Sequence, residues 1–169
     1  CLLDPSGSQP ETILRRNYAI VSGMTRDVTN AFISGDLQLA KAVVARDVES
    51  NRLYFLLVRI LRTIIQNPRL SEKLGITPID CLDYRLAASL IESMGDACVQ
   101  VASKTLQLNG FKPAAELHTL LIELQKVCCD AHEQALKSFV NKDMALADNV
   151  RNMQTKITSI YTDIEKVAR

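Results

Sequence analysis

Apolar residues recur along this chain every three or four positions, which is the period of an amphipathic α-helix. Few turn signals interrupt the pattern; they include Ser34-Gly35-Asp36, Asn67-Pro68, and Asn109-Gly110 with Pro113. Asp36 is a suitable N-cap for the second helix, and Thr77, Asp80 or Asp83 for the third. The breaks predict five helices and no strand, so we predict an all-α fold. The helices cover residues 11–32, 36–66, 77–108, 114–140 and 144–168.

Short breaks between long helices favour antiparallel neighbours, which is the architecture of a helical bundle. Residues 67–78 form a longer break of roughly a dozen residues, with two prolines and a glycine, and we interpret it as a loop. Residues 1–10 contain proline, glycine and serine without an apolar period. We therefore expect a linker there, leading from a further N-terminal domain.

The chain also contains an internal repeat. A shift of 107 residues aligns FISGDLQLA, residues 32–40, with FVNKDMALA, residues 139–147, and gives six identities in 23 positions. The helices at 114–140 and 144–168 therefore resemble the first two helices. We predict one complete three-helix unit over residues 11–109 and two helices of a second unit over 110–169. The apolar stripes of those two helices need cover from the first unit, another subunit or further sequence.

Composition and charge exclude several classes of protein. The net charge is +1, from 20 basic and 19 acidic side chains, so the chain offers no electrostatic footprint for nucleic acid. The longest apolar run, residues 53–58, is far shorter than the ~20 residues that span a bilayer, so we expect no membrane insertion. Five cysteines without a CxxC pair indicate free thiols and a cytoplasmic location. No catalytic motif is found, so we predict a protein that is not an enzyme.

Two pairs of oxygen-bearing side chains stand out as a candidate site. Asp47 and Asn51 project from the apolar arc of the second helix, where an unpaired carboxylate is costly to bury. Glu92 and Asp96 have the same spacing on the third helix, away from an apolar stripe. Pairs on adjacent helices of a bundle can converge on a hard or borderline metal ion. The stripe on the third helix consists of Leu86, Leu90, Met94, Ala97 and Val101.

Simpler interpretations of these residues stay open. Glu92 and Asp96 suit an ordinary solvated helix face, and Arg85 on the same face would neutralise a carboxylate without a metal. The two histidines and the two adjacent cysteines on the fourth helix are weaker candidates. Because neighbouring residues on a helix point in different directions, we expect one of these two cysteines to be exposed and mildly reactive. These four residues are His118, His132, Cys128 and Cys129.

Two segments of the chain resemble the PhoU family of phosphate-uptake regulators. FISGDLQLAKAVVARDVESNRLYFLL, residues 32–57, is similar to the family's Gly-Asp break followed by a helix with an acidic D-x-x-x-D/N motif. DYRLAASLIESMGDACVQVA, residues 83–102, is similar to its third helix, with E-x-x-x-D inside an ERIGDHA-like run. The resemblance covers residues 17–108 as one repeat and, more faintly, 114–168 as most of a second.

The resemblance implies a cytosolic regulator that acts by contact with a phosphate transporter or a sensor kinase. The apolar stripes of the last two helices lead us to expect a homo-oligomer, such as a dimer. It also implies a transition metal, iron or zinc, with Asp47, Asn51, Glu92 and Asp96 as the ligands. The sequence departs from the family pattern at several positions. Asn51 replaces a second acidic residue, Ser93-Met94 replaces Arg-Ile, and Ala97-Cys98 replaces His-Ala. Gln154 and Thr158 replace the metal motif in the second repeat, so at most one metal centre per chain is expected.

Two other functions compete with this one. The LYFLLVR segment and the linker-like start resemble the archaeal branch of the family, in which a small DNA-binding domain can precede the PhoU repeats. The chain would then be the dimerisation and sensing domain of a transcription regulator, and a basic or hairpin domain upstream would distinguish this case. A carboxylate-bridged metalloenzyme is the least favoured, because the sequence lacks the Glu-x-x-His pairs that such bundles use.

Overall fold

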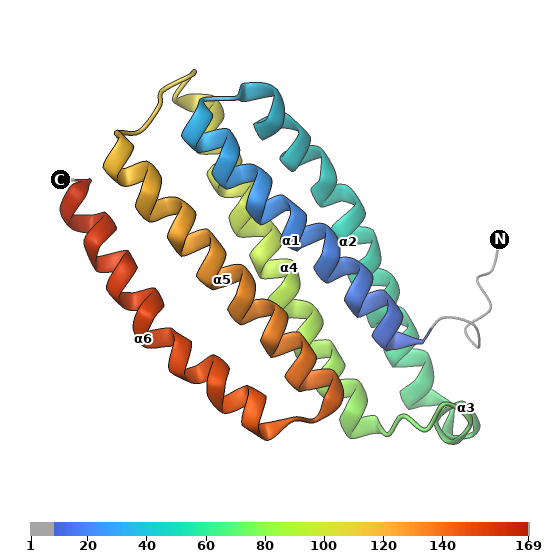
Figure 1. The fold of residues 1–169 in the computed structure, drawn as a ribbon. Coiled ribbons are helices and arrows are strands. Elements are labelled where there is room, and N and C mark those ends of the chain that lie inside the picture. The colour runs from blue at the N-terminus through green and yellow to red at the C-terminus, as the bar shows by residue number, and fades with distance from the viewer. Residues whose placement is uncertain (1–8, 169) are drawn as a thin grey trace. The chain divides into compact units, whose positions relative to one another are not determined.

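The computed structural model describes residues 9–168, which form six α-helices (Figure 1). The prediction of an all-α fold is confirmed, and the ends of the five long helices lie within a few residues of the predicted ones. The linker predicted for residues 1–10 falls mostly on residues 1–8, outside the described residues. The helices are α1 (Pro10–Ser34), α2 (Leu37–Gln66), α3 (Pro68–Leu74), α4 (Pro78–Gln107), α5 (Ala115–Asn141) and α6 (Met144–Val167).

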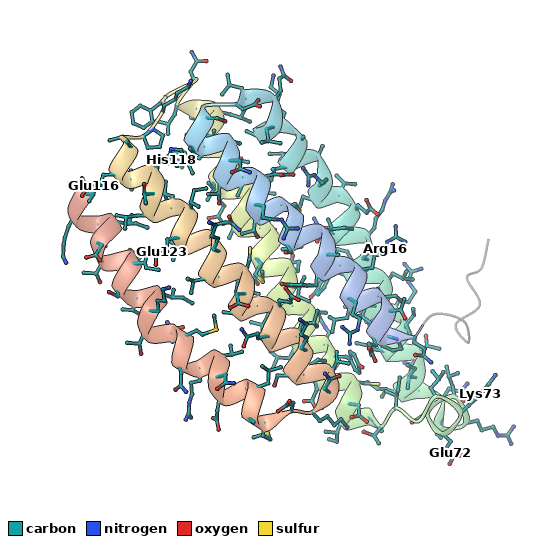
Figure 2. All side chains as sticks on the ribbon, in the orientation of Figure 1. Arg16, Glu72, Lys73, Glu116, His118 and Glu123 are labelled. Carbon is teal, nitrogen blue, oxygen red and sulfur yellow. The ribbon has the colours of Figure 1, made fainter. Side chains whose placement is uncertain are left out.

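Helix α3 corrects the prediction of a loop over residues 67–78. The Asn67 side chain accepts a hydrogen bond from the Leu70 amide at 3.2 Å, and Pro68 occupies the first turn. Gly75 ends the helix in the left-handed conformation, with φ of 64°. The capping residues at both ends of α3 are therefore present in the sequence. A helix of seven residues, however, is too short to show an apolar period, so the sequence pattern did not predict it. Figure 2 shows Glu72 and Lys73 projecting outward from α3.

The chain divides into two compact units that share three helices. The first consists of Cys1–Met24 and Ala42–Gln100, and so includes most of α1, α2 and α4 and all of α3. The second consists of Thr25–Lys41 and Val101–Arg169, and so includes the α1–α2 turn, the end of α4, α5 and α6. Within the described residues, none of the helices combines the length and hydropathy needed to cross a bilayer.

In the first unit, α1, α2 and α4 lie side by side and contribute one core (Figure 1). Burial of these apolar side chains is the main source of stability for such a unit. Helices α1 and α2 contribute large side chains, whereas most of those from α4 are small. The buried residues include Leu14, Val21 and Met24 from α1, Val43, Leu57, Leu61 and Ile64 from α2, and Cys81, Ala88, Ile91 and Cys98 from α4.

The orientation of α4 differs from the one its largest apolar residues suggested. Leu86 and Leu90 of the predicted stripe are 63% and 61% exposed, whereas Ala88 and Cys98 are buried. A close contact between helices selects small residues, so the side of α4 with the least hydrophobic mass is the side in the core. The stripe is therefore apolar without being part of this core.

In the second unit, α5 and α6 pack against each other in an antiparallel hairpin (Figure 1). A salt bridge of 3.3 Å joins Glu123 of α5, labelled in Figure 2, to Lys156 of α6. Within these two helices only Ala131, Ser138 and Ile160 are buried. Most other apolar side chains of the hairpin are only half-buried, so the pair keeps much apolar surface in contact with solvent.

The two turns related by the shift of 107 residues share one geometry. Gly35 and Lys142 both adopt the left-handed conformation, with φ of 69° and 53°. The next residue is Asp36 or Asp143, and each aspartate accepts a hydrogen bond at 3.0 Å from the backbone amide three residues later. The same left-handed C-cap followed by the same aspartate N-cap supports the internal repeat.

The two turns predict that exchanging the left-handed residue changes the stability in opposite directions, with a loss at Gly35 and a gain at Lys142. An L-residue in the left-handed region costs about 1–2 kcal/mol, and a Cβ added at Gly35 would also lie 2.9 Å from the Gly110 carbonyl oxygen. We expect Gly35→Ala to lower the free energy of unfolding by about 2 kcal/mol and Lys142→Gly to raise it by about 1 kcal/mol. Urea denaturation followed by circular dichroism measures both.

Gly75→Ala is the matched control for the clash at Gly35. Gly75 has a similar φ of 64°, but a Cβ there would meet nothing within 4 Å. Gly75→Ala should therefore cost less than Gly35→Ala, and the difference measures the contact with Gly110. Equal costs at the two glycines, or a loss of stability in Lys142→Gly, would contradict this account of the turns.

Candidate functional site

The candidate site lies in the first unit, between α2 and α4. Asp47 and Asn51 lie one turn apart on α2, and the Asn51 amide donates a hydrogen bond of 2.7 Å to Asp47 Oδ2. Glu92 and Asp96 lie one turn apart on α4. The negative charge of Asp96 acts on both Asp47 and Glu92, so the structure brings these three carboxyl groups within electrostatic reach of one another.

The pKa values of two of these carboxyl groups are raised. Burial raises the pKa of Asp47 most, followed by the charge of Asp96, and the hydrogen bond from Asn51 partly offsets both. Burial also leads the rise in the pKa of Glu92, with Asp96 and then Asp47 adding to it and Arg85 opposing it. Because folding raises both values, the ionised groups destabilise the fold at neutral pH, and this penalty disappears as the pH falls below their unfolded pKa values. Burial and repulsion from Asp96 thus both act against the ionised forms of Asp47 and Glu92.

Gly95 allows α4 to approach α1 and α2 at this point. A Cβ added there would lie 3.5 Å from Val21 Cγ2 of α1, 3.6 Å from Asp47 Oδ1 and 3.7 Å from Ser50 Oγ of α2. The α4 backbone between Glu92 and Asp96 therefore passes directly over Asp47. Sequence reasoning noted Gly95 only as part of a motif, and its packing role depends on contacts with both other helices.

A buried polar pair next to the cluster was missed altogether. Ser50 Oγ of α2 donates a hydrogen bond of 2.8 Å to Asn17 Oδ1 of α1, and the two residues are 1% and 2% exposed. A buried polar group without a partner is costly, so this pair constrains how α1 and α2 fit together. Ser50 lies one turn after Asp47, and the pair thereby helps to fix the position of that carboxylate.

Arg85 is the compensating cation that the sequence suggested. Its guanidinium donates a hydrogen bond to the Tyr54 hydroxyl and lies 4.9 Å from the centroid of the Tyr54 ring. It lowers the pKa of Glu92, but burial and the two aspartates outweigh it. Arg85 is thus directed mainly at a tyrosine, and its charge only partly offsets the rise in the pKa of Glu92.

The weaker candidates lie on α5, in the second unit. His118 is exposed near the start of the helix (Figure 2), and His132 is half-buried. Among the described residues, His132 Nδ1 finds no hydrogen-bond partner, and burial lowers the pKa of its imidazole. The prediction that one of the two adjacent cysteines is exposed is wrong. Cys128 and Cys129 are both half-buried, because the helix turns each to one edge of its packed face, and burial raises the pKa of the Cys128 thiol.

The chemistry of the cluster fits a cation, although its present arrangement does not form a finished metal site. Carboxylate and amide oxygens are donors that hard cations prefer, and a cation would offset both the burial of Asp47 and Glu92 and the repulsion that Asp96 exerts on them. Within residues 9–168, no three His, Cys, Asp or Glu side chains are grouped closely enough to hold a metal ion as they stand. Binding would require the side chains of Asp47, Glu92 and Asp96 to reorient toward a common point.

The fold and the site together define a helical-bundle protein with an acidic cluster between two helices of a three-helix unit. The family model of the PhoU domain matches residues 14–105, which is more than half of the chain. The chain therefore belongs to the PhoU family, whose members are regulators of phosphate homeostasis and not enzymes. No curated protein and no solved structure matches the chain.

Proposed function

We propose that this protein regulates phosphate uptake from the cytoplasm, by direct contact with a phosphate transporter component or a signalling partner such as a sensor kinase. We further propose that the cluster of Asp47, Asn51, Glu92 and Asp96 holds a transition metal, iron or zinc, and that the protein acts as a homo-oligomer. The observation that carries the metal proposal is the close approach of α4 at Gly95, between Glu92 and Asp96, to the Asp47 carboxylate of α2. The charge of Asp96 adds to burial in raising the pKa of both Asp47 and Glu92. Membership of the PhoU family supports the proposal of phosphate regulation.

A cation bound at the cluster would make contact with the partner depend on the concentration of free metal. The carboxylates come from two helices, so their mutual repulsion opposes the packing of α2 on α4, and a bound cation would reverse the sign of that interaction. A ligand changes an equilibrium only through its different affinity for two states. A metal-loaded cluster and an empty one differ in charge on the same surface, which is the kind of difference that a protein partner can distinguish.

Elemental analysis of the purified, untagged protein tests the metal proposal. We expect stoichiometric iron or zinc in the parent and none in the isosteric triple variant Asp47→Asn, Glu92→Gln, Asp96→Asn, which keeps the shape of the cluster and removes its charge. The matched control is Glu72→Gln, Glu116→Gln, Asp130→Asn, because these three acids are exposed and lie elsewhere. The control should keep the metal.

The metal site and the regulation of phosphate uptake can be tested independently of each other. A metal-free parent after purification without chelators, or metal retained in the cluster variant, would remove the metal and leave the family function in place. Phosphate uptake tests that function in cells lacking the gene and complemented with the parent or either variant. We expect the parent and the control to restrain uptake when phosphate is plentiful. Uptake unaffected by the parent would contradict phosphate regulation.

A further inference from the structure

Helix α2 has an outward face on which arginines alternate with apolar side chains. We name it the α2 basic face and define it as Val48, Arg52, Phe55, Arg59 and Arg62, all of which are exposed. Their spacing of four, three, four and three residues keeps them on one side of the helix. Both acids of α2 lie off this side, and so do its buried core residues. The face therefore combines positive charge with apolar surface that the fold does not use.

The three arginines of this face are uncompensated within the part of the chain that the structure describes. Their guanidinium groups make neither a hydrogen bond nor an ion pair there. The two acids of α2 are engaged elsewhere, because Glu49 pairs with Arg16 at 2.8 Å and Asp47 accepts the hydrogen bond from Asn51. Since the whole chain has a net charge of +1, three uncompensated guanidinium groups concentrate positive charge on α2. The face thus favours an anionic partner.

A shallow groove of about 460 Å³ gives the face an apolar centre. Two of its apolar side chains are largely open to solvent, with Phe55 62% and Val48 58% exposed. Along the helix, Phe55 lies between Arg52 and Arg59, so positive charge flanks the apolar surface on both sides. Phosphate groups border acyl chains in a matching way at the surface of an anionic bilayer. The groove is lined by Val48, Asn51, Arg52, Phe55, Leu56 and Arg59.

A bilayer suits this face better than an acidic protein does. Protein interfaces require closely complementary shapes, whereas this face is convex apart from one shallow groove, and a fluid lipid surface adapts to it. Arginine side chains bind phosphate groups through paired hydrogen bonds, and aromatic side chains are enriched where lipid headgroups meet the acyl chains. From Arg52 to Arg62 the guanidinium groups extend over ten residues, about 15 Å along the axis. This length spans more than one headgroup.

We infer that the α2 basic face binds the surface of a bilayer that contains anionic lipid, with its arginines on lipid phosphates and Phe55 among the headgroups. Such attachment needs no helix that spans the bilayer, and none of the described helices could span one. The inference rests on the charge and exposure of α2. It depends neither on phosphate regulation nor on the metal.

Flotation of the whole chain with lipid vesicles, in the presence of a chelator, tests the inference. We expect the parent to bind vesicles of equimolar phosphatidylcholine and phosphatidylglycerol but not vesicles of phosphatidylcholine alone, and added salt should release it. The variant Arg52→Gln, Arg59→Gln, Arg62→Gln should lower the partition coefficient on the order of 100-fold, because each basic residue near an anionic surface contributes about fivefold. The matched control removes the same charge at exposed residues of the second unit and should bind nearly as well as the parent. It is Lys112→Gln, Lys126→Gln, Arg151→Gln.

Fluorescence tests which face of the protein meets the lipid. The chain contains no tryptophan, so Phe55→Trp introduces a single reporter without changing the charge. We expect its emission to shift to shorter wavelength on the anionic vesicles and to be quenched by brominated acyl chains. Phe111→Trp is the matched control, since Phe111 is 53% exposed between α4 and α5, and its emission should not change.

The outcomes separate the bilayer from other partners. A parent that does not bind the anionic vesicles would overturn the inference, including the case in which an acidic protein covers this face. Binding retained in the arginine variant, or quenching of Phe111→Trp but not of Phe55→Trp, would overturn the assignment to α2. Circular dichroism verifies that each variant is folded, and Phe55→Trp keeps the test decisive if the arginine variant is not.

Discussion

Leu57→Ala is expected to lower the free energy of unfolding by about 2–5 kcal/mol. Leu57 is 1% exposed and lies on the face of α2 that packs against α1 and α4. Truncation removes buried apolar surface and leaves a cavity that helices on two sides cannot easily fill. Urea denaturation followed by circular dichroism, at one fixed protein concentration, measures the loss.

Phe55→Ala is the matched comparison, since it removes a larger side chain two residues away. Phe55 is 62% exposed, so its replacement should change the stability by no more than about 0.5 kcal/mol. If Phe55→Ala costs as much as Leu57→Ala, then α2 does not present the face described here to the core. The comparison thus tests the rotation of the helix about its axis and not only its presence.

The run of six apolar residues at 53–58 shows what sequence patterns predict well and where they stop. The apolar period identified the helix, but a helix turns 100° per residue, so six consecutive residues cover every side of it. Leu53, Tyr54 and Leu57 are buried, whereas Phe55 is exposed. The apolar period of the whole helix predicts which side of it is buried. A short run of consecutive apolar residues does not.

The helix ends were predictable because capping is local chemistry. Asp36 and Asp143 bond to amides within three residues of themselves, so the sequence alone contains the whole interaction. The rotation of α4 was not predictable in the same way. Its leucines predicted that their own face would be buried. The buried face is instead the one with small residues, which permit a close approach to α1 and α2.

The same distinction applies to the candidate site. The spacing of Asp47 with Asn51 and of Glu92 with Asp96 lies within single helices and is visible in the sequence. The bond between Asn17 and Ser50 joins residues 33 positions apart, and no local pattern marks it. Its signal is a polar residue on each of two apolar helix faces, which is recognisable only once the two faces are known to meet.

Gly95→Leu is expected to lower the free energy of unfolding by about 3 kcal/mol, because four carbon atoms would enter a junction of three helices. The position of a Cβ there is already within 3.7 Å of atoms on α1 and α2. Gly95→Ala should be tolerated, since contacts of 3.5–3.7 Å are ordinary, and it should gain up to about 1 kcal/mol from helix propensity. The two variants are thus expected to change the free energy of unfolding in opposite directions.

Gly23→Leu separates crowding from the general effect of replacing a helical glycine. Gly23 lies within α1, and a Cβ there would meet only the tip of Arg46, at 3.5 Å, which can move aside. We expect Gly23→Leu to change the stability by less than about 1 kcal/mol in urea denaturation. A cost at Gly95 no larger than at Gly23 would show that α4 does not approach α1 and α2 this closely. In that case Asp47 would no longer be held against the Glu92–Asp96 segment, and the acidic cluster would lose its structural basis.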